Sequence, residues 1–332
     1  MIDYCTNIDI PKSFFDVSFK DRFMFIGSCF ADNIGVKMKE YKFNVVVNPF
    51  GVLYNPSSVA SACRCLLKPD LFAENDLFYH DGMYHSFMHH GKFSDVSAAD
   101  CIKRINESLV TASENFRNLS FLVITFGTAI VYHHKVSRQI VANCHKLPAA
   151  QFEQELLTVE GIIDEWSVLL ENIRALNPLL NIIFTVSPIR HLKDGAHLNQ
   201  ISKATLLLAQ QHLVEKYSGR VSYFPAYELM MDELRDYRFY ANDMLHPSEV
   251  AIDYIWERFC DTYLDAESKD ILKEVENINK ALNHRPFNPS TDANKQFLMQ
   301  TLLKIKRIQS KYPYLCLSEE ENEIKSKQQK HK

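Results

Sequence analysis

Short apolar runs that end at glycine, serine or asparagine alternate with helical patterns along most of this 332-residue chain. The clearest apolar runs cover 22–26, 44–47, 121–126, 181–186 and 221–224. Helical spacing of apolar residues is clearest over 30–41, 98–116, 149–177, 198–217 and 247–263. Strands that alternate with helices favour a mostly parallel sheet covered on both faces. The sequence therefore predicts an α/β fold.

Composition is that of a large folded domain. Hydrophobic residues make up 46% of the chain, which is enough for a substantial core. The net charge is −4, and basic residues are scattered through most of the sequence, so no nucleic-acid partner is expected. No run of about 18 apolar residues occurs, so no membrane span is expected.

The cysteines and the N-terminus bear on location and on metal binding. Met1–Cys5 lacks a basic start followed by an apolar segment, so we expect no signal peptide and a cytoplasmic protein. The eight cysteines are dispersed, without a C-x-x-C pair, which favours reduced thiols. Neither G-x-G-x-x-G nor a P-loop is present, so we expect no nucleotide cofactor. Six histidines suggest a polar pocket lining rather than a metal site: His80, His85, His89, His90, His133 and His134.

Changes in pattern along the chain indicate its organisation. Residues 1–265 are predicted to form the sheet domain, interrupted by irregular inserts at about 71–95 and 130–147. Residues 266–316 have helical, charged patterns and are predicted to form a helical extension. Residues 317–332 are almost wholly polar and are predicted to be a disordered tail. The sequence does not specify an oligomeric state.

The corner at the end of the first apolar run is a candidate catalytic position. The run stops at Gly27-Ser28, and a helical pattern begins directly behind it. α/β hydrolases place a nucleophilic serine on such a turn, at the carboxyl edge of the sheet. Far downstream, Asp243 and His246 lie three residues apart, just before another helix. A serine hydroxyl needs a base, and the base needs an orienting group, so we predict a Ser28-His246-Asp243 triad.

This chemistry also needs hydrogen-bond donors for a developing oxyanion. The backbone N–H of Ser28 is one candidate, and that of Gly51, after the second strand, is another. The turn at Thr128 offers a third through its backbone or hydroxyl. Because parallel strands end along one edge of a sheet, we expect these groups to converge with Ser187 and His246.

Neighbouring residues offer alternatives and substrate contacts. Cys29 is an alternative nucleophile, since a thiol at a helix N-terminus is acidified, although its side chain is expected to point into packing. Arg190 is a candidate for holding an anionic group on a substrate, with a salt bridge as the structural alternative. Tyr237, Phe239 and Tyr240 are interpreted as core or as a substrate wall. The candidate substrate-binding residues are Asn48, Arg190, His191, His145 and Tyr240.

Several ordered motifs resemble the GSCFA family, within the wider SGNH (GDSL-like) hydrolase group. They are Gly27-Ser28-Cys29-Phe30-Ala31 and the segments 48–56, 125–129, 143–146, 187–191, 236–240 and 243–246. The resemblance implies a three-layer flavodoxin-like fold, with Ser28 as nucleophile, His246 as base, Asp243 as its orienting group and Gly51 as an oxyanion donor. One departure is that the wider group has an oxyanion-binding Asn where this chain has Ala129.

These observations together predict a serine-dependent ester hydrolase. Small acyl groups, such as acetyl on a carbohydrate, are the preferred substrates by analogy with the wider group. An acyltransferase would use the same site with an alcohol in place of water. A catalytically weak carbohydrate-binding or scaffold protein is a third hypothesis, motivated by Ala129, the helical extension and the charged tail.

Overall fold

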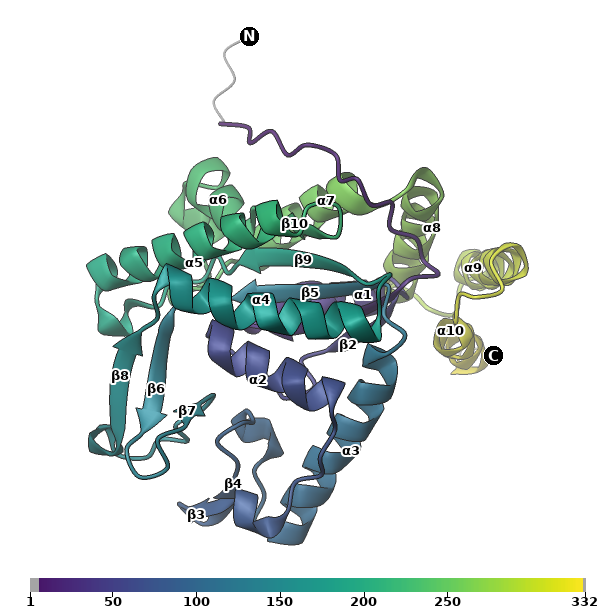
Figure 1. Ribbon diagram of the computed structural model, residues 1–332. Coiled ribbons are helices and arrows are strands. Elements are labelled where there is room, and N and C mark those ends of the chain that lie inside the picture. The colour runs from purple at the N-terminus through teal and green to yellow at the C-terminus, as the bar shows by residue number, and fades with distance from the viewer. Residues whose placement is uncertain (1–5, 331–332) are drawn as a thin grey trace.

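The computed structural model describes residues 6–330 and is built around a five-stranded parallel sheet (Figure 1). Its strands are β1 (Arg22–Gly27), β2 (Asn44–Val47), β5 (Phe121–Phe126), β9 (Asn181–Val186) and β10 (Val221–Tyr223). They lie side by side in the order β2-β1-β5-β9-β10, all parallel. This is the flavodoxin-like order, which reverses direction between β1 and β5. The predicted α/β fold is confirmed.

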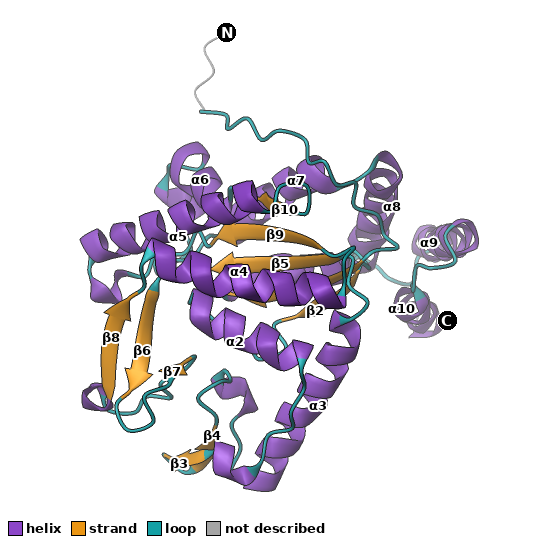
Figure 2. Ribbon diagram, in the orientation of Figure 1, coloured by secondary structure: helices purple, strands orange, loops and turns teal. Residues whose placement is uncertain are grey.

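Helices cover both faces of the sheet (Figure 2). Alternate residues of β1 point to opposite faces, with Phe23 and Phe25 in one core cluster and Met24 and Ile26 in the other. The helices on the Phe23 side are α1 (Cys29–Glu40) and α7 (Glu249–Tyr263). Those on the Met24 side are α2 (Pro56–Leu67), α3 (Ala98–Phe116), α4 (Val159–Leu176) and α5 (Ala196–Lys216).

Five of the helices that cover the sheet have their first turns capped by side chains. Each capping oxygen accepts a hydrogen bond from a backbone N–H of its helix, and the caps are Ser28, Asn55, Ser97, Thr158 and Ser248. Such caps satisfy N–H groups that have no partner within the helix. Because Ser28 directly follows β1, the N-terminus of α1 is fixed at the carboxyl edge of the sheet.

The inserts form two small antiparallel sheets. The hairpin β3 (Phe78–His80) and β4 (Met83–His85) turns at Asp81-Gly82. The second sheet has the order β7-β6-β8. Its strands are β6 (Ile130–His134), β7 (Ile140–Val141) and β8 (Phe152–Leu156). The prediction of helix from residue 149 is therefore wrong, because the polar segment β8 pairs along the length of β6.

Short turns of helix complete the region before α8. The 3₁₀ turns are η1 (Glu74–Asp76), η2 (Gly91–Phe93), η3 (Ala149–Gln151), η4 (Leu192–Asp194) and η6 (Tyr237–Phe239). The short helix α6 (Ala226–Glu228) runs into the π-helical turn η5 (Leu229–Glu233). Together α6, η5 and η6 lead the chain from β10 to the loop before α7.

Three helices form the C-terminal extension: α8 (Ala266–Asn283), α9 (Asp292–Lys311) and α10 (Ser318–Lys330). The prediction of a disordered tail is wrong for α10, because Ile324 is fully buried and Glu320 forms an ion pair with Lys42. Asn279 of α8 also bonds the carbonyl of Glu40. These contacts fall on the end of α1 and on the turn between α1 and β2, so the extension lies away from the carboxyl edge (Figure 1).

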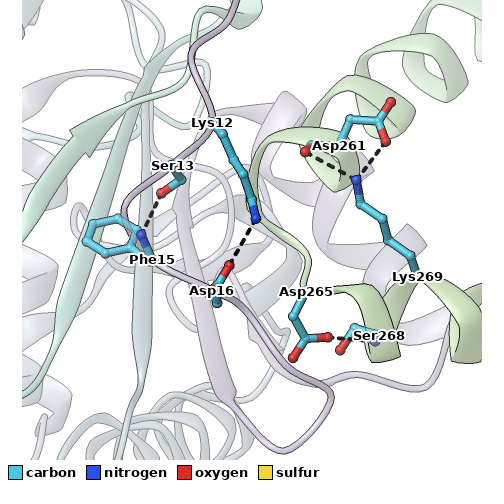
Figure 3. A network of polar contacts seen from close by, with 8 residues as sticks. All are labelled: Lys12, Ser13, Phe15, Asp16, Asp261, Asp265, Ser268 and Lys269. Atoms are coloured by element: carbon cyan, nitrogen blue, oxygen red, sulfur yellow. Dashed lines mark hydrogen bonds and ion pairs between the residues drawn. The ribbon is translucent and has the colours of Figure 1, made fainter.

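The N-terminal segment runs across the junction of α7 and α8 (Figure 3). Val17 pairs with Leu264, and Asp265 caps α8 by accepting the N–H of Ser268. Residues 1–5, on which the expectation of no signal peptide rests, and 331–332 lie outside the described residues. Within 6–330, no helix is long and apolar enough to cross a membrane.

Candidate active site

A cavity of about 530 Å³ lies at the carboxyl edge of the sheet, beside the point where the strand order reverses. Ligands of open α/β sheets bind at this position. Its lining comes from the start of α1, the approach to α2, the ends of β5 and β9, the loop before α7 and the second small sheet. The lining residues are Cys29, Tyr54, Asn55, Thr128, Ile130, Tyr132, 141–144, 189–194, Leu245 and His246.

His246 lies on this cavity and is held by Asp243. Its ring Nδ1 is 2.6 Å from Oδ2 of Asp243, while Oδ1 accepts the N–H groups of Leu245 and His246 at 2.9 Å each. These two backbone N–H groups, and then the imidazole, lower the pKa of Asp243 to about 2. A carboxylate at Nδ1 leaves Nε2 as the nitrogen that can take a proton. The contact predicted between Asp243 and His246 is therefore present.

Backbone hydrogen bonds within the loop that carries this pair hold the loop in shape. Ala241 donates to the carbonyl of His246 at 2.7 Å, and Ser248 donates to that of Phe239 at 2.8 Å. Tyr240 and Pro247 form an isolated antiparallel bridge. The loop therefore presents His246 from a fixed turn just before the first residue of α7.

Ser28 is not exposed in the cavity. Its side chain is fully buried, and its Oγ accepts the N–H of Phe30 at 3.3 Å as the cap of α1. Among residues 6–330, no hydrogen bond joins Ser28 to His246 or to any other histidine. The contact predicted for the catalytic pair is absent here, because the cap geometry turns the hydroxyl back onto the helix.

Cys29, the first residue of α1, lines the cavity together with His246. Its thiol is partly exposed and lies 3.7 Å from the hydroxyl of Tyr54. The prediction that this side chain points into packing is confirmed in part, because Cys29 packs against the core cluster that contains Phe23 and also lines the cavity.

The N–H groups predicted to bind an oxyanion already have partners. Ser28 donates to the carbonyl of Thr125 at 3.2 Å, and Gly51 donates to that of Asn48 at 2.8 Å. Thr128 donates its N–H to Tyr54, and its hydroxyl lies 3.0 Å from that of Ser202. The prediction that these groups are free to bind an oxyanion is therefore corrected, because each of them already holds a turn at the end of a strand.

Gly127 allows three groups to meet behind the cavity. A Cβ added at Gly127 would lie 3.1 Å from Nε2 of His191, 3.1 Å from the carbonyl oxygen of Tyr54 and 3.5 Å from Cβ of Ser28. Nε2 of His191 is buried without a hydrogen-bond partner. Burial, and then the charges of Lys203 and His246, lower the pKa of His191 to about 4. His191 is therefore a neutral imidazole at the cavity wall.

Residues 22–259 match the model of the GSCFA family. The chain belongs to the GSCFA family. Residues 275–330 of this GSCFA chain match the model of a GSCFA C-terminal domain, which covers most of helices α8 to α10. No curated protein matches the sequence.

One solved structure is distantly similar to this GSCFA protein. It is an acetyl xylan esterase from the rumen bacterium Butyrivibrio proteoclasticus, 11% identical, with a TM-score of 0.35. The alignment covers 77% of the GSCFA chain and 64% of the esterase chain. The GSCFA chain therefore spans less than two thirds of the length of the esterase. At this TM-score the likeness carries no argument about activity.

The predicted substrate-binding residues of the GSCFA protein fall into two groups. Arg190 and His191 line the cavity, and Tyr240 lines an adjoining one of about 460 Å³ that shares Arg190. Asn48 is buried, with its amide on Asp32 and its oxygen accepting the N–H of Gly27, so it fixes the turn instead. His145 is also buried and bonds the carbonyl of Ser86, which corrects its predicted role.

Lys203 of α5, which is buried behind the cavity, was not predicted from the sequence to belong to the site. Its ammonium group donates to the carbonyls of Gly127 and Ser187 at 2.7 Å each. Burial, and then Arg190, lower its pKa to about 7. It ties together the ends of β5 and β9. The signal was a lysine in helical register with the buried Leu206, Gln210 and Leu213.

Buried histidines beneath the hairpin give this GSCFA protein a testable pH dependence. Burial lowers the pKa of His89 to about 3 and that of His145 to about 4. Unfolding restores ordinary values, so it takes up protons below about pH 6.5 and stability falls toward pH 4. Each such histidine adds up to about 1.4 kcal/mol per pH unit.

This dependence is measurable as urea unfolding free energies between pH 7.5 and 4.5. His89→Phe is expected to flatten the slope, and replacement of the exposed His212 by Gln serves as the control. A slope that His89→Phe leaves unchanged would show that His89 is not the source.

The concavity at the other edge of the sheet has a different lining. A concavity of about 740 Å³ lies at the opposite, amino edge, and its lining residues include no histidine or cysteine. Among residues 6–330, no three His, Cys, Asp or Glu side chains are placed to hold a metal ion. The cavity with His246 is the site to which the chemistry described here is assigned.

Proposed function

We propose that this GSCFA protein is an acyl hydrolase in which His246 is the general base and Asp243 orients it. The observation that carries the proposal is the 2.6 Å contact between the two side chains, on a loop that delivers His246 to the cavity. The start of α1 lies on the same cavity and brings the Gly27-Ser28-Cys29 corner to it. Membership of the SGNH group is part of this proposal and is supported by the strand order and the Asp243–His246 spacing.

In this scheme a nucleophile from the corner attacks an ester carbonyl while Nε2 of His246 takes its proton. The sequence assigns the attack to Ser28, with Cys29 as the alternative. His246 then protonates the leaving alcohol, and water, activated by the same imidazole, releases the acid. Negative charge on the carbonyl oxygen is favoured by the positive end of the α1 dipole.

Small acyl esters are the proposed substrate class, with acetylated carbohydrate preferred. The cavity volume of about 530 Å³ is in the range of sites that bind small molecules. Tyr54 and Tyr132 offer aromatic surface in its wall, and Asn55 and Asn143 offer amides. These groups suit a polar ring compound that bears a short acyl group.

A binding protein without turnover is the second candidate. The engaged N–H groups of Ser28, Gly51 and Thr128 favour it, because each would have to leave its carbonyl partner to bind an oxyanion. The N–H of Ala129 is also occupied, by the hydroxyl of Ser202 at 2.7 Å. Turnover of a simple ester separates the two candidates.

The test is initial-rate hydrolysis of p-nitrophenyl acetate and butyrate by the full chain and its His246→Ala variant. We expect the variant to be at least about 10³-fold slower, because the nucleophile loses its base. His212→Ala, on the exposed face of α5, controls for nonspecific imidazole catalysis. Equal rates for the wild type and His246→Ala would reject the proposal.

A further inference from the structure

We propose that the adjoining cavity, which Arg190 and Tyr240 line, binds an anionic group, a carboxylate or a phosphate, on the alcohol part of the ester. The inference rests on the proposed function and names the substrate class of the same site. Arg190 and Arg235 hold the anion, while Tyr237 and Tyr240 contact the ring that bears it. The favoured substrates are therefore acylated acidic sugars or sugar phosphates rather than neutral acyl esters.

The adjoining cavity, of about 460 Å³, is continuous in its lining with the cavity that contains His246. Arg190, Leu192 and Leu245 line both, and His246 directly follows Leu245 in the chain. Asp243, which holds the imidazole, lines the adjoining cavity. An ester whose acyl group lies at His246 can therefore extend its alcohol part past Arg190 into the adjoining cavity.

The guanidinium of Arg190 has no oxygen acceptor among residues 6–330. Its hydrogen-bond partner there is the thioether sulfur of Met231, 3.1 Å from Nη2. A guanidinium has five N–H donors in a planar fork, and a thioether sulfur is only a weak acceptor. The salt bridge considered from the sequence as the structural alternative is therefore not formed within this part of the chain. The remaining N–H donors of Arg190 are available to a ligand.

A second cationic group lies close to Arg190. Burial, and then the charge of Arg190, lower the pKa of Lys203 to about 7. The charge of Arg190 also lowers the pKa of the Tyr227 hydroxyl, although burial raises that pKa more. Like charges that lie close together repel each other, so an anion bound at Arg190 would offset this repulsion. The electrostatic environment thus favours a negatively charged ligand.

Arg235, just before η6, supplies a second guanidinium to the adjoining cavity. Its Nη2 donates to the hydroxyl of Thr6 at 3.0 Å, and no carboxylate pairs with it among residues 6–330. Arginine binds carboxylates and phosphates through two parallel N–H groups. Two such groups on one cavity can therefore hold an anion from two sides.

Two carboxylates also line the adjoining cavity, and both are engaged elsewhere. Asp243 holds the ring of His246, with 2.6 Å between Oδ2 and Nδ1. Asp236 forms an ion pair with Arg238 at 3.2 Å and also accepts the backbone N–H of that residue. Neither carboxylate forms an ion pair with an arginine of this cavity. The charge that remains for a ligand is therefore positive.

Tyr237 and Tyr240 give the adjoining cavity a surface for a ring compound. Their ring centroids are 6.2 Å apart, and Tyr237 is 77% exposed. The hydroxyl of Tyr240 lies 4.0 Å from the sulfur of Met231, the same atom that Arg190 contacts. Aromatic side chains combine an apolar face with a polar tip. Next to a guanidinium, they suit a sugar ring that bears a negative charge.

The experiment compares three O-acetylated sugars that differ at carbon 6: methyl glucoside, methyl glucuronide and methyl glucoside 6-phosphate. Acetate release gives kcat and KM for the full-length wild type, Arg190→Gln and Arg235→Gln. Arg174→Gln removes a charge from α4, outside both cavities, and is the matched control. The three sugars without acetyl are titrated by calorimetry, so that binding is measured without turnover. Circular dichroism spectra confirm that each variant is folded.

The expected result is a KM at least about tenfold lower for one of the two anionic esters than for the neutral ester. Arg190→Gln is expected to raise that KM about 10–100-fold and to leave the KM of the neutral ester within about threefold. A purely structural arginine would not produce this difference. Arg235→Gln is expected to act in the same direction, and Arg174→Gln to match the wild type. The two anionic esters show whether the cavity prefers carboxylate or phosphate.

Other outcomes separate this inference from the proposed function. Equal kcat/KM for the three esters, or equal losses for neutral and anionic esters in Arg190→Gln, overturns the inference and leaves the hydrolase intact. Tighter binding of an anionic sugar that Arg190→Gln abolishes, without hydrolysis of any ester, supports the inference and favours a binding protein. A folded wild type with neither turnover nor a preference for an anionic sugar overturns both.

Discussion

Replacement of Gly27 by alanine is expected to lower the free energy of unfolding by about 3 kcal/mol or more. The added Cβ would lie 2.1 Å from the carbonyl oxygen of Thr125, the residue that pairs with Gly27 across β1 and β5. Gly27 also has φ +146°, which L-residues rarely adopt. Because the obstructing atoms are backbone, the two strands must move apart at the carboxyl edge.

Gly82→Ala is the matched control for this substitution. Gly82 has φ +78° in the exposed hairpin turn, and no atom lies within 4 Å of an added Cβ. Gly82→Ala is therefore expected to cost only the free energy of placing alanine at a positive φ, about 1–2 kcal/mol. Urea denaturation of both variants gives the difference. If Gly27→Ala were no less stable than Gly82→Ala, the close approach of β1 and β5 would be wrong.

Asp243→Asn is expected to slow ester hydrolysis by about 10³–10⁴-fold while the fold stays intact. Oδ1 of Asp243 accepts two backbone N–H groups, so the single oxygen of an amide would take that position. The amide NH₂ would then face Nδ1 of His246 and force the ring proton onto Nε2. The imidazole keeps its place but loses the nitrogen that acts as base.

Rates for Asp243→Asn are compared with those for Asp253→Asn at saturating p-nitrophenyl acetate. Asp253 of α7 forms an ion pair with Lys37 of α1 and lies outside both cavities, so its replacement removes one charge without touching the imidazole. A loss of less than tenfold in Asp243→Asn would mean that the contact does not set the tautomer.

Strand and helix positions in the main sheet were predictable because short buried apolar runs alternate with helical patterns along the chain. Two segments were not predicted correctly. The segment 152–156 has a helix-favouring composition, and its pairing with β6 is a contact that no local pattern encodes. α10 is almost wholly polar, and the burial of Ile324 depends on the packing of α10 against α8 and α9.

The candidate site was predicted in part. The spacing of Asp243 and His246 was sufficient, because a carboxylate three residues ahead of an imidazole closes a local turn. The sequence was not sufficient to predict which residue of the corner faces the cavity, because that depends on whether Ser28 caps α1. The signal was present, since a serine directly before a helical pattern is a preferred cap. Lys203 was missed because its two carbonyl partners come from distant strand ends.

The central claim is that the corner after β1 and the imidazole before α7 act together on one bond. A double-mutant cycle with Ser28→Ala and His246→Ala, using initial rates of p-nitrophenyl acetate hydrolysis, tests it directly. Groups that act as a unit are strongly non-additive, so the double variant is predicted to be about as slow as either single variant. Losses that multiply would show that the two residues act independently and would contradict the account.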